Sequence, residues 1–336
     1  MGILVSLFGI FLFLLLITLG VWGLESYALF GIIIPYAAIL LFLAGFLYRV
    51  IKWAGSPVPF HIPTVCGQQK SFPWIKTSYV DSPSTTGGVI ARLALEVLLF
   101  RSLLKNEKVE LQGPQRLFFK TSTYLWLGAM AFHWSLLVIV IRHLRFFLEP
   151  IPTAIVVLQR VDSILQNLLP VLYITDIIII LALAYLFFRR VIYPQVRYIS
   201  LPSDYFVLLI LAGIALSGIL MRLIYRVDLT YVKEWVMSMG SFHPKLPQGV
   251  NILFYIHLFF VSLLIAYFPL SKLMHMAGIF LSPTRNLMNA SRNERHVNPW
   301  NYPVKVHTYE EWEDEFRDSM KEAGLPVEHD GKTDGS

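Results

Sequence analysis

Long uncharged stretches of apolar residues dominate the pattern of the chain. Four of them contain no Asp, Glu, Lys or Arg and are each close to the roughly 20 residues that a helix needs to cross a bilayer core: residues 3–24, 29–48, 121–141 and 250–271. Residues 163–188 contain a single acid, Asp176, and residues 205–221 form a shorter uncharged run. The pattern predicts an all-α fold, a polytopic membrane helix bundle of six transmembrane helices.

Charge and composition add an orientation to this prediction. Of the 336 residues 56% are hydrophobic, and the formal net charge is +6. Lys and Arg gather in the segments that lie on the same side as the N-terminus, which favours both termini in the cytoplasm. A basic face beside anionic lipid accounts for the positive charge without a nucleic-acid partner. The first apolar run is long and has no basic leader, so we expect an anchor that is retained in the cytoplasmic (inner) membrane.

The chain divides into four regions by composition. We expect two N-terminal transmembrane helices in residues 1–50, a cytoplasmic loop in 51–117, a four-helix core in 118–280 and a cytoplasmic C-terminal tail in 281–336. Within the loop, "GVIARLALEVLLFRSLLKN" has the pattern of an amphipathic helix, which fits a membrane or partner surface or the protein's own core. In the tail, "TYEEWEDEFRDSMKEAG" predicts a short acidic helix that suits a soluble partner or is simply a solvated appendage.

Four of the nine histidines lie in or at the ends of predicted spans. They are His133 and His143, ten residues apart, and His257 and His275, eighteen residues apart. On an ideal helix the first gap rises about 15 Å and turns about 80°, and the second makes about five whole turns, so both pairs can face inward. The third and sixth helices run antiparallel, which brings His143 near His257 on the outer side and His133 near His275 on the inner side.

Two opposed imidazoles are what a low-spin b-type haem requires, and two such sites would carry electrons across the membrane. The single cysteine, Cys66, and the lack of a CxxCH motif restrict any haem to non-covalent binding. Several alternatives remain open. A single intramembrane histidine is often a packing residue, and straight helices would place His133 closest to His257 and so hold one haem. Pro269 could bend the sixth helix and restore two sites. A haem-free anchor or a proton-coupled transporter with relay histidines is the competing function.

Haem propionates need cations or interfacial water around them. We expect the propionate contacts among basic residues close to the histidines: Arg142, Arg145, Arg222 and Arg226 near the outer site and Lys272 near the inner site. Ordinary snorkelling of cations to the interface is the alternative explanation for these residues.

The histidine spacing resembles that of the cytochrome b subunit of respiratory nitrate reductase, the NarI family, over roughly the last five predicted helices. Outside the helices, "PFHIPTVCGQQKS", "SPSTTGGVIARLALEVLLFRSLLKN" and "NPWNYPVKVHTYEEWEDEFRD" resemble the DsrM family, the membrane cytochromes b of DsrMKJOP complexes in sulfur metabolism, along nearly the whole chain. The resemblance implies two haem b groups. His143 and His257 would hold the outer haem, and His133 and His275 the inner one.

The same resemblance implies an electron-transfer subunit of a menaquinol-oxidising oxidoreductase complex. Its expected partners are a DsrK-like cytoplasmic iron-sulfur protein and DsrJ-, DsrO- and DsrP-like subunits. NarI-like proteins use a lysine after the second-helix ligands for quinone, whereas this chain has Arg160 and Asp162 there. Asp176 could accept the proton of the quinol, or it could serve a polar contact between helices.

Overall fold

The computed structural model describes residues 2–56, 67–105, 107–112, 116–168, 171–290, 292 and 306–328, and side chains are not described for 107–112 and 116–120. Cys66 lies outside these residues. The longer helices are α1 (Gly2–Thr18), α2 (Ile34–Ala54), α3 (Thr86–Leu99), α5 (Thr123–His143), α6 (Thr153–Asp162), α7 (Ile174–Ile192), α9 (Pro202–Leu223), α10 (Leu229–Gly240), α11 (Ile252–Tyr267) and α14 (Tyr309–Glu322). The shorter ones are α4 (Arg101–Leu104), α8 (Pro194–Ile199), α12 (His275–Leu281) and α13 (Pro283–Asn286).

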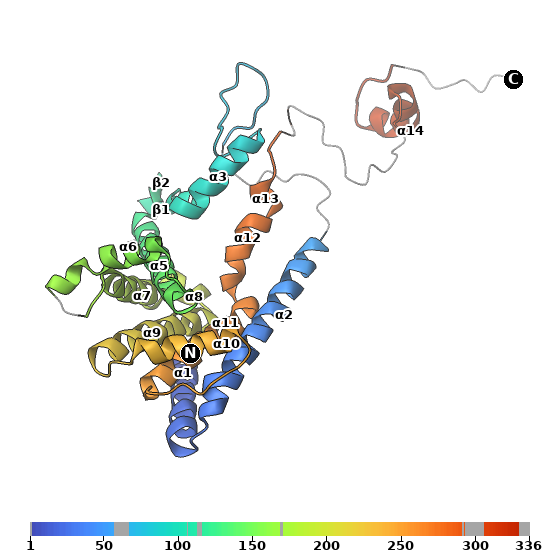
Figure 1. Ribbon diagram of the computed structural model, residues 1–336. Coiled ribbons are helices and arrows are strands. Elements are labelled where there is room, and N and C mark those ends of the chain that lie inside the picture. The colour runs from blue at the N-terminus through green and yellow to red at the C-terminus, as the bar shows by residue number, and fades with distance from the viewer. Residues whose placement is uncertain are drawn as a thin grey trace.

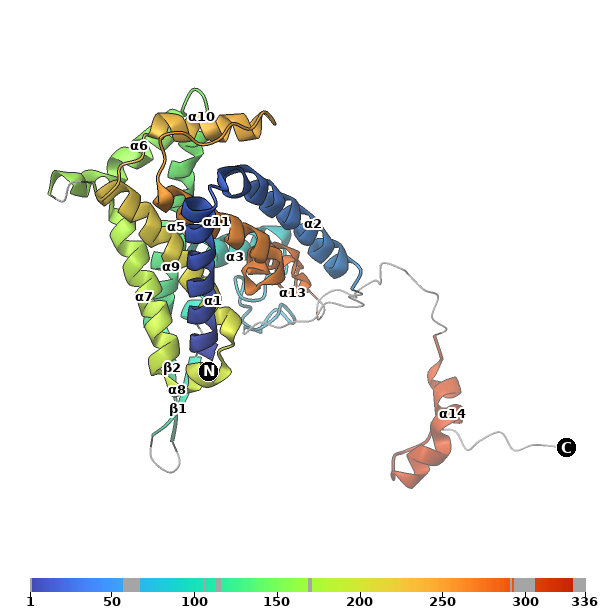
Figure 2. The same ribbon diagram turned by 90° about the horizontal axis from the view of Figure 1, so that it is seen from below.

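The fold is a polytopic helical membrane bundle, as the hydropathy pattern predicts. Among the described residues, five helical stretches are long and apolar enough to cross a membrane: Gly2–Gly23, Leu29–Ala54, Thr123–Phe146, Pro202–Leu223 and Ile252–Leu270. The remaining predicted span, residues 163–188, corresponds to α7, which carries Asp176 in its first turn and Arg189 and Arg190 in its last. Helix α9 packs against α1, α7 and α11, while α5 packs against α7, and α2 against α11. Figure 2 shows α6 and α10 at one end of this bundle and α8 with the N-terminus at the other.

Aromatic packing and small residues hold these helices together. One buried cluster joins α1, α9 and α11 through Ile17, Ile210 and Phe260, and a second joins α5, α7 and α9. A Cβ on Gly128 of α5 would lie 2.5 Å from the ring of Tyr185 on α7. Helices in a membrane associate by such close van der Waals packing, so this glycine allows α5 and α7 to approach.

The predicted sixth helix is interrupted, which corrects the expectation of one span with a bend. Helix α11 ends at Tyr267, two short 3-10 turns cover Phe268–Leu270 and Lys272–Met274, and α12 begins at His275. Pro269 lacks the N–H that a continuing helix needs, and the Ser271 side chain accepts a hydrogen bond from the Leu273 N–H at 3.1 Å to start the next turn. His257 and His275 therefore lie on separate helices.

Helix α7 begins at Ile174, whereas the sequence places the start of this span near residue 163. Residues 164–167 form a 3-10 turn instead. The Asp176 carboxylate accepts a hydrogen bond from the Tyr173 N–H at 3.0 Å, and an acid in the first turn also interacts favourably with the helix dipole. Asp176 therefore lies at the end of the span and not deep within it.

The region between α2 and α5 is folded onto the bundle. Helix α3 packs against α12 and α13, and Asn289 donates hydrogen bonds to the Pro83 carbonyl at 2.6 Å and to Ser82 Oγ at 2.8 Å. This amphipathic helix thus contacts the protein's own helices, while Ile90 and Leu98 remain exposed. The sequence did not predict the antiparallel hairpin of β1 (Glu107–Gln112) and β2 (Arg116–Thr121), with Glu107 opposite Thr121.

The acidic helix predicted in the tail is confirmed as α14. Its N-cap residue Thr308 accepts a hydrogen bond from the Glu311 N–H at 3.3 Å, and the Glu311 carboxylate accepts one from the Thr308 N–H at 3.1 Å. This reciprocal capping explains why the helix begins here. Both views draw α14 apart from the bundle (Figures 1 and 2).

Candidate functional site

The four histidines singled out in the sequence form two facing pairs. The ring centroids of His143 and His257 lie 6.4 Å apart with planes at 14°, and those of His133 and His275 lie 6.0 Å apart with planes at 82°. We call these the arginine-side pair and the α3-side pair, after their neighbours. They are the same two combinations that antiparallel helices predict, and the alternative of His133 facing His257 is not the one observed.

All four imidazoles are held through the same nitrogen. Nδ1 lies 2.8 Å from the Ala129 carbonyl in His133 and 2.7 Å from the Ile139 carbonyl in His143. In His275 it lies 2.7 Å from the Lys272 carbonyl. A carbonyl oxygen only accepts hydrogen bonds, so each Nδ1 carries the proton and each Nε2 keeps its lone pair.

His257 is positioned by a helix other than its own. Its Nδ1 lies 3.0 Å from the Ile214 carbonyl and 3.1 Å from Ser217 Oγ, both on α9. Sequence reasoning missed Ser217, because a serine in a membrane helix has many roles and nothing in its spacing points to α11. The Nδ1 contact to a carbonyl is the arrangement that fixes the orientation of metal-ligating histidines.

The geometry of both pairs fits a six-coordinate iron between them. A metal–imidazole bond is about 2.0 Å long, so two imidazoles on opposite sides of one iron have ring centres about 6 Å apart. Both observed separations are close to this value. Among the described helices, α5 packs mainly on α7, and α11 packs on α9 and α2. Helices α5 and α11, which carry the histidines of the arginine-side pair, are therefore not packed closely on each other.

A network of four charged side chains, of which Arg142, Asp162 and Asp176 are buried, lies beside the arginine-side pair. Arg142 Nε lies 3.1 Å from Asp162 Oδ2, and Arg142 Nη2 lies 3.7 Å from Asp176 Oδ1. Arg222 Nη2 lies 2.6 Å from Asp176 Oδ2. The guanidinium carbons of Arg142 and Arg222 lie 3.8 Å and 4.8 Å from the ring centroid of Tyr173, a cation–π arrangement. Two positive and two negative charges balance here, and α5, α6, α7 and α9 each supply one of them.

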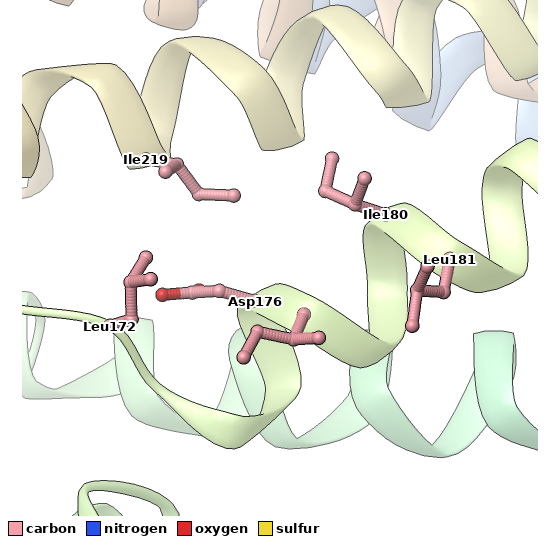
Figure 3. A pocket seen from close by; sticks show the side chains of 6 residues that line it. Leu172, Asp176, Ile180, Leu181 and Ile219 are labelled. Atoms are coloured by element: carbon pink, nitrogen blue, oxygen red, sulfur yellow. The ribbon is translucent and has the colours of Figure 1, made fainter. Parts of the chain in front are cut away.

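Asp176 also lines an apolar pocket of about 220 Å³. Figure 3 shows its carboxylate among aliphatic side chains from α7, α9 and the segment before α7. The other residues that line the pocket are Leu172, Ile177, Ile180, Leu181 and Ile219. The surface of the pocket is apolar, because the Asp176 oxygens are engaged by the Tyr173 N–H and by Arg222.

The remaining predicted cations have other surroundings. Arg145 Nη1 donates a hydrogen bond to Gln159 Oε1 at 2.9 Å, and Arg226 is exposed after the end of α9. Lys272 Nζ lies 2.8 Å from Asp204 Oδ1, and its side chain is 73% exposed. The Lys272 carbonyl, in contrast, holds His275, so this residue contacts the α3-side pair through its backbone.

The α3-side pair is covered by Phe100, at the junction of α3 and α4. The Phe100 ring centroid lies 4.8 Å from that of His133. The indole N–H groups of Trp126 and Trp134 on α5 donate hydrogen bonds to the Leu99 and Leu98 carbonyls at 2.6 Å and 3.2 Å. The end of α3 is thereby fixed onto α5 beside His133, whereas His275 is exposed.

The chain matches known proteins over most of its length. Residues 91–291 match the family of the nitrate reductase gamma subunit. The chain is 43% identical over 279 residues to a protein of Archaeoglobus fulgidus named "Hdr-like menaquinol oxidoreductase cytochrome b-like subunit", which covers 81% of this chain and 83% of that protein. A protein of Archaeoglobus profundus with the same name is 43% identical over 276 residues, 80% of this chain and 81% of its own.

Proposed function

The chain belongs to the nitrate reductase gamma subunit family, and from that premise we propose that it is a dihaem b-type membrane cytochrome of a menaquinol oxidoreductase complex. In this role it transfers electrons between menaquinol and a cytoplasmic iron-sulfur partner. The relatives of 43% identity are named as cytochrome b-like subunits of an Hdr-like menaquinol oxidoreductase, which supports the proposal.

The observation that carries the proposal is the pair of facing imidazole pairs, at 6.4 Å and 6.0 Å between ring centroids. His143 and His257 would be the axial ligands of one haem b, and His133 and His275 those of the other. When bound, haem b supplies the one-electron redox chemistry. The chain would supply the ligands and their orientation through Nδ1.

Menaquinol oxidation belongs at the arginine side in this proposal. The pocket beside Asp176 is apolar and has one carboxylate, which suits a hydrophobic ring that must release protons as it loses electrons. We place this end on the outer side and both termini in the cytoplasm, following the distribution of Lys and Arg. Protons would then leave outward while electrons pass inward to the α3-side pair.

The partner belongs at the cytoplasmic end. A DsrK-like iron-sulfur protein would receive the electrons, with DsrJ-, DsrO- and DsrP-like subunits in the wider complex. Helix α14 supports a protein partner, because Tyr309, Trp312 and Phe316 form an exposed aromatic row, with neighbouring ring centroids 6.0 Å and 5.6 Å apart. Residues 309–322 are strongly acidic, and an acidic helix is repelled by anionic lipid.

The test is a haem count on the purified chain and on His257→Ala. We expect a reduced b-type spectrum and two haems per wild-type chain by pyridine haemochrome. His257→Ala should retain one haem, because only the arginine-side pair loses a ligand. The matched control is His243→Ala, an exposed histidine of the α10–α11 connection, which should retain both. A colourless wild type, or two haems in His257→Ala, would contradict the proposal.

A further inference from the structure

A second group of charged side chains lies where α3, α4 and α13 meet. Arg285 Nη1 of α13 lies 2.8 Å from Glu96 Oε1 of α3, and Glu96 Oε2 accepts a hydrogen bond from Ser102 Oγ at 2.8 Å. Asp81 forms an ion pair with Arg101, and Lys105 Nζ lies 2.8 Å from Asp81 Oδ2. Both carboxylates of the group therefore have cationic partners already.

Arg92 is the member of this group with an unsatisfied donor. The residue is only 5% exposed, and its Nη2 is buried with no hydrogen-bond acceptor in the part of the chain that the structure describes. Burial and then the nearby Arg285 lower the pKa of Arg92, as expected for a guanidinium whose charge is poorly compensated. Leaving a buried charged donor unpaired is costly, so this position calls for an anion.

The charge count of the group shows how much negative charge a ligand would have to supply. Among its described side chains, four cations (Arg92, Arg101, Lys105 and Arg285) face two carboxylates (Asp81 and Glu96). Two positive charges are left in excess. A ligand with two carboxylates would neutralise them.

The same two segments that build this group also build the α3-side pair. Helix α3 leads directly into Phe100, whose ring packs on His133. Helix α12, which begins with His275, leads directly into α13 and Arg285. Figure 1 shows α3, α12 and α13 next to one another, as their packing requires. The binding site of a ligand held by His133 and His275 therefore lies next to the charged group that contains Arg92. An anionic substituent of that ligand could reach Arg92.

We propose that Arg92, together with Arg285, binds a propionate carboxylate of the haem that His133 and His275 hold, an inference that rests on the proposed function. A guanidinium matches a carboxylate with two parallel N–H···O hydrogen bonds. The two propionates of one haem equal the excess of two positive charges. Lys272, the cation that the sequence suggested for this haem, is paired with Asp204 and mostly exposed, and it is the weaker candidate.

The test is a redox titration of the purified dihaem protein with Arg92→Gln. Loss of the cation destabilises the reduced haem, which carries one more negative charge than the oxidised one. We expect the midpoint potential of the α3-side haem to fall, with a tenfold change in its reduction equilibrium, or about 59 mV for one electron. The potential of the other haem should stay unchanged. The two haems are assigned with His257→Ala, which keeps only the α3-side haem.

Lys105→Gln is the matched control. It removes the same charge from the same group, but at a side chain that is half exposed and bound to Asp81, so its shift should be several times smaller. Equal shifts in both variants would overturn the inference, because they would report general charge and not a contact. A shift that appears only in vesicles with anionic lipid, and is lost in zwitterionic lipid, would assign Arg92 to a lipid headgroup and also overturn it.

A second measurement covers the case in which Arg92→Gln does not insert. Arg92→Lys keeps the charge, and redox-difference infrared spectra can be recorded on it and on the wild type with haem carrying ¹³C at the propionate carboxyls. A labelled carboxylate band that moves between the two supports the contact, and an unmoved band overturns it. If the wild type binds no haem, the proposed function itself fails; if it binds two and Arg92→Gln changes neither potential, only this inference fails.

Discussion

The two charged groups beside the histidine pairs use the same residue types but differ in balance. On the arginine side, Arg142 and Arg222 face Asp162 and Asp176, and every charge has an opposite within the protein. On the α3 side, cations outnumber carboxylates and Arg92 retains a buried, unsatisfied N–H. Arg142 Nε in the first group also lacks a hydrogen bond, but it lies 3.1 Å from an Asp162 oxygen. The first group is therefore electrically neutral without a ligand, whereas the second is open to an anion. Equivalent histidine pairs can therefore have unequal electrostatic surroundings.

The balanced group has a structural role within the bundle itself. Its four charges come from four helices, and burial makes each unpaired charge expensive. The network ties α5, α6, α7 and α9 together at one end of the bundle. Holding His143 in place is a consequence, because Arg142 is its neighbour in the chain.

The largest effect that we expect is from Asp162→Ala. This change leaves the buried Arg142 with one distant carboxylate, and breaking a buried ion pair on one side costs about 3–5 kcal/mol of unfolding free energy. Denaturant unfolding in micelles measures it. Glu149→Ala is the control, because Glu149 is 65% exposed and its ion pair with Lys233 is a surface pair, worth about 0–1 kcal/mol. Equal losses of unfolding free energy in the two variants would show that the network does not hold these four helices together.

The second effect concerns the function of the balanced group. Asp176→Asn removes the carboxylate from the apolar pocket, and we expect quinol-driven haem reduction to slow by about 100-fold, the lower end for loss of a general base. Reduction by dithionite should be unchanged, since it does not need the pocket. Asp228→Asn, at the exposed start of α10, is the control for a surface carboxylate. An unchanged rate of reduction by quinol would leave Asp176 with a structural role alone.

The smallest effect is a pH dependence on the α3 side. Burial alone would raise the pKa of Asp81, but hydrogen bonds from Arg101 and Lys105 outweigh it and lower this pKa from 3.8 to about 2. A carboxylate with a lowered pKa stabilises the fold fully above its unfolded pKa and loses this contribution as the pH falls through the folded value. We expect protection of α3 in hydrogen exchange to weaken between about pH 4 and pH 2 in the wild type.

Asp81→Asn supplies the comparison for this pH dependence. Its α3 should be less protected than that of the wild type at pH 6 and should show little further change down to pH 2, because the titrating group is absent. A wild type and variant with parallel profiles would mean that another carboxylate controls the docking of α3.

Much of the bundle could be predicted from the sequence because hydropathy reports burial in lipid directly. The uncharged runs give the spans, and the topology alone brings His143 toward His257 and His133 toward His275. The acidic helix α14 also follows from local pattern, since its capping residues are adjacent in the chain. These features depend on neighbours within a few turns or on the simple alternation of helix direction.

The parts that were missed depend on contacts between distant segments. Pro269 signals a bend, but the complete break before His275 also needs Ser271 to begin a new turn. Asp176 looks like a residue deep in the membrane until α7 is seen to begin beside it. Nothing local distinguishes Arg92 from Arg101 and Lys105 of the same segment, because its unsatisfied donor depends on α13 and on how Glu96 and Asp81 are already paired.

The break between α11 and α12 has a consequence for how the two histidine pairs respond to a structural change in the loop region. His257 lies within a helix of 16 residues that α9 supports directly, whereas His275 starts a helix of 7 residues. A helix that short does not hold its shape by itself, so the position of His275 depends on what surrounds it, α3 and α13 above all. A disturbance of the loop region, by a bound subunit for example, would reach one imidazole pair while the other stays as it was.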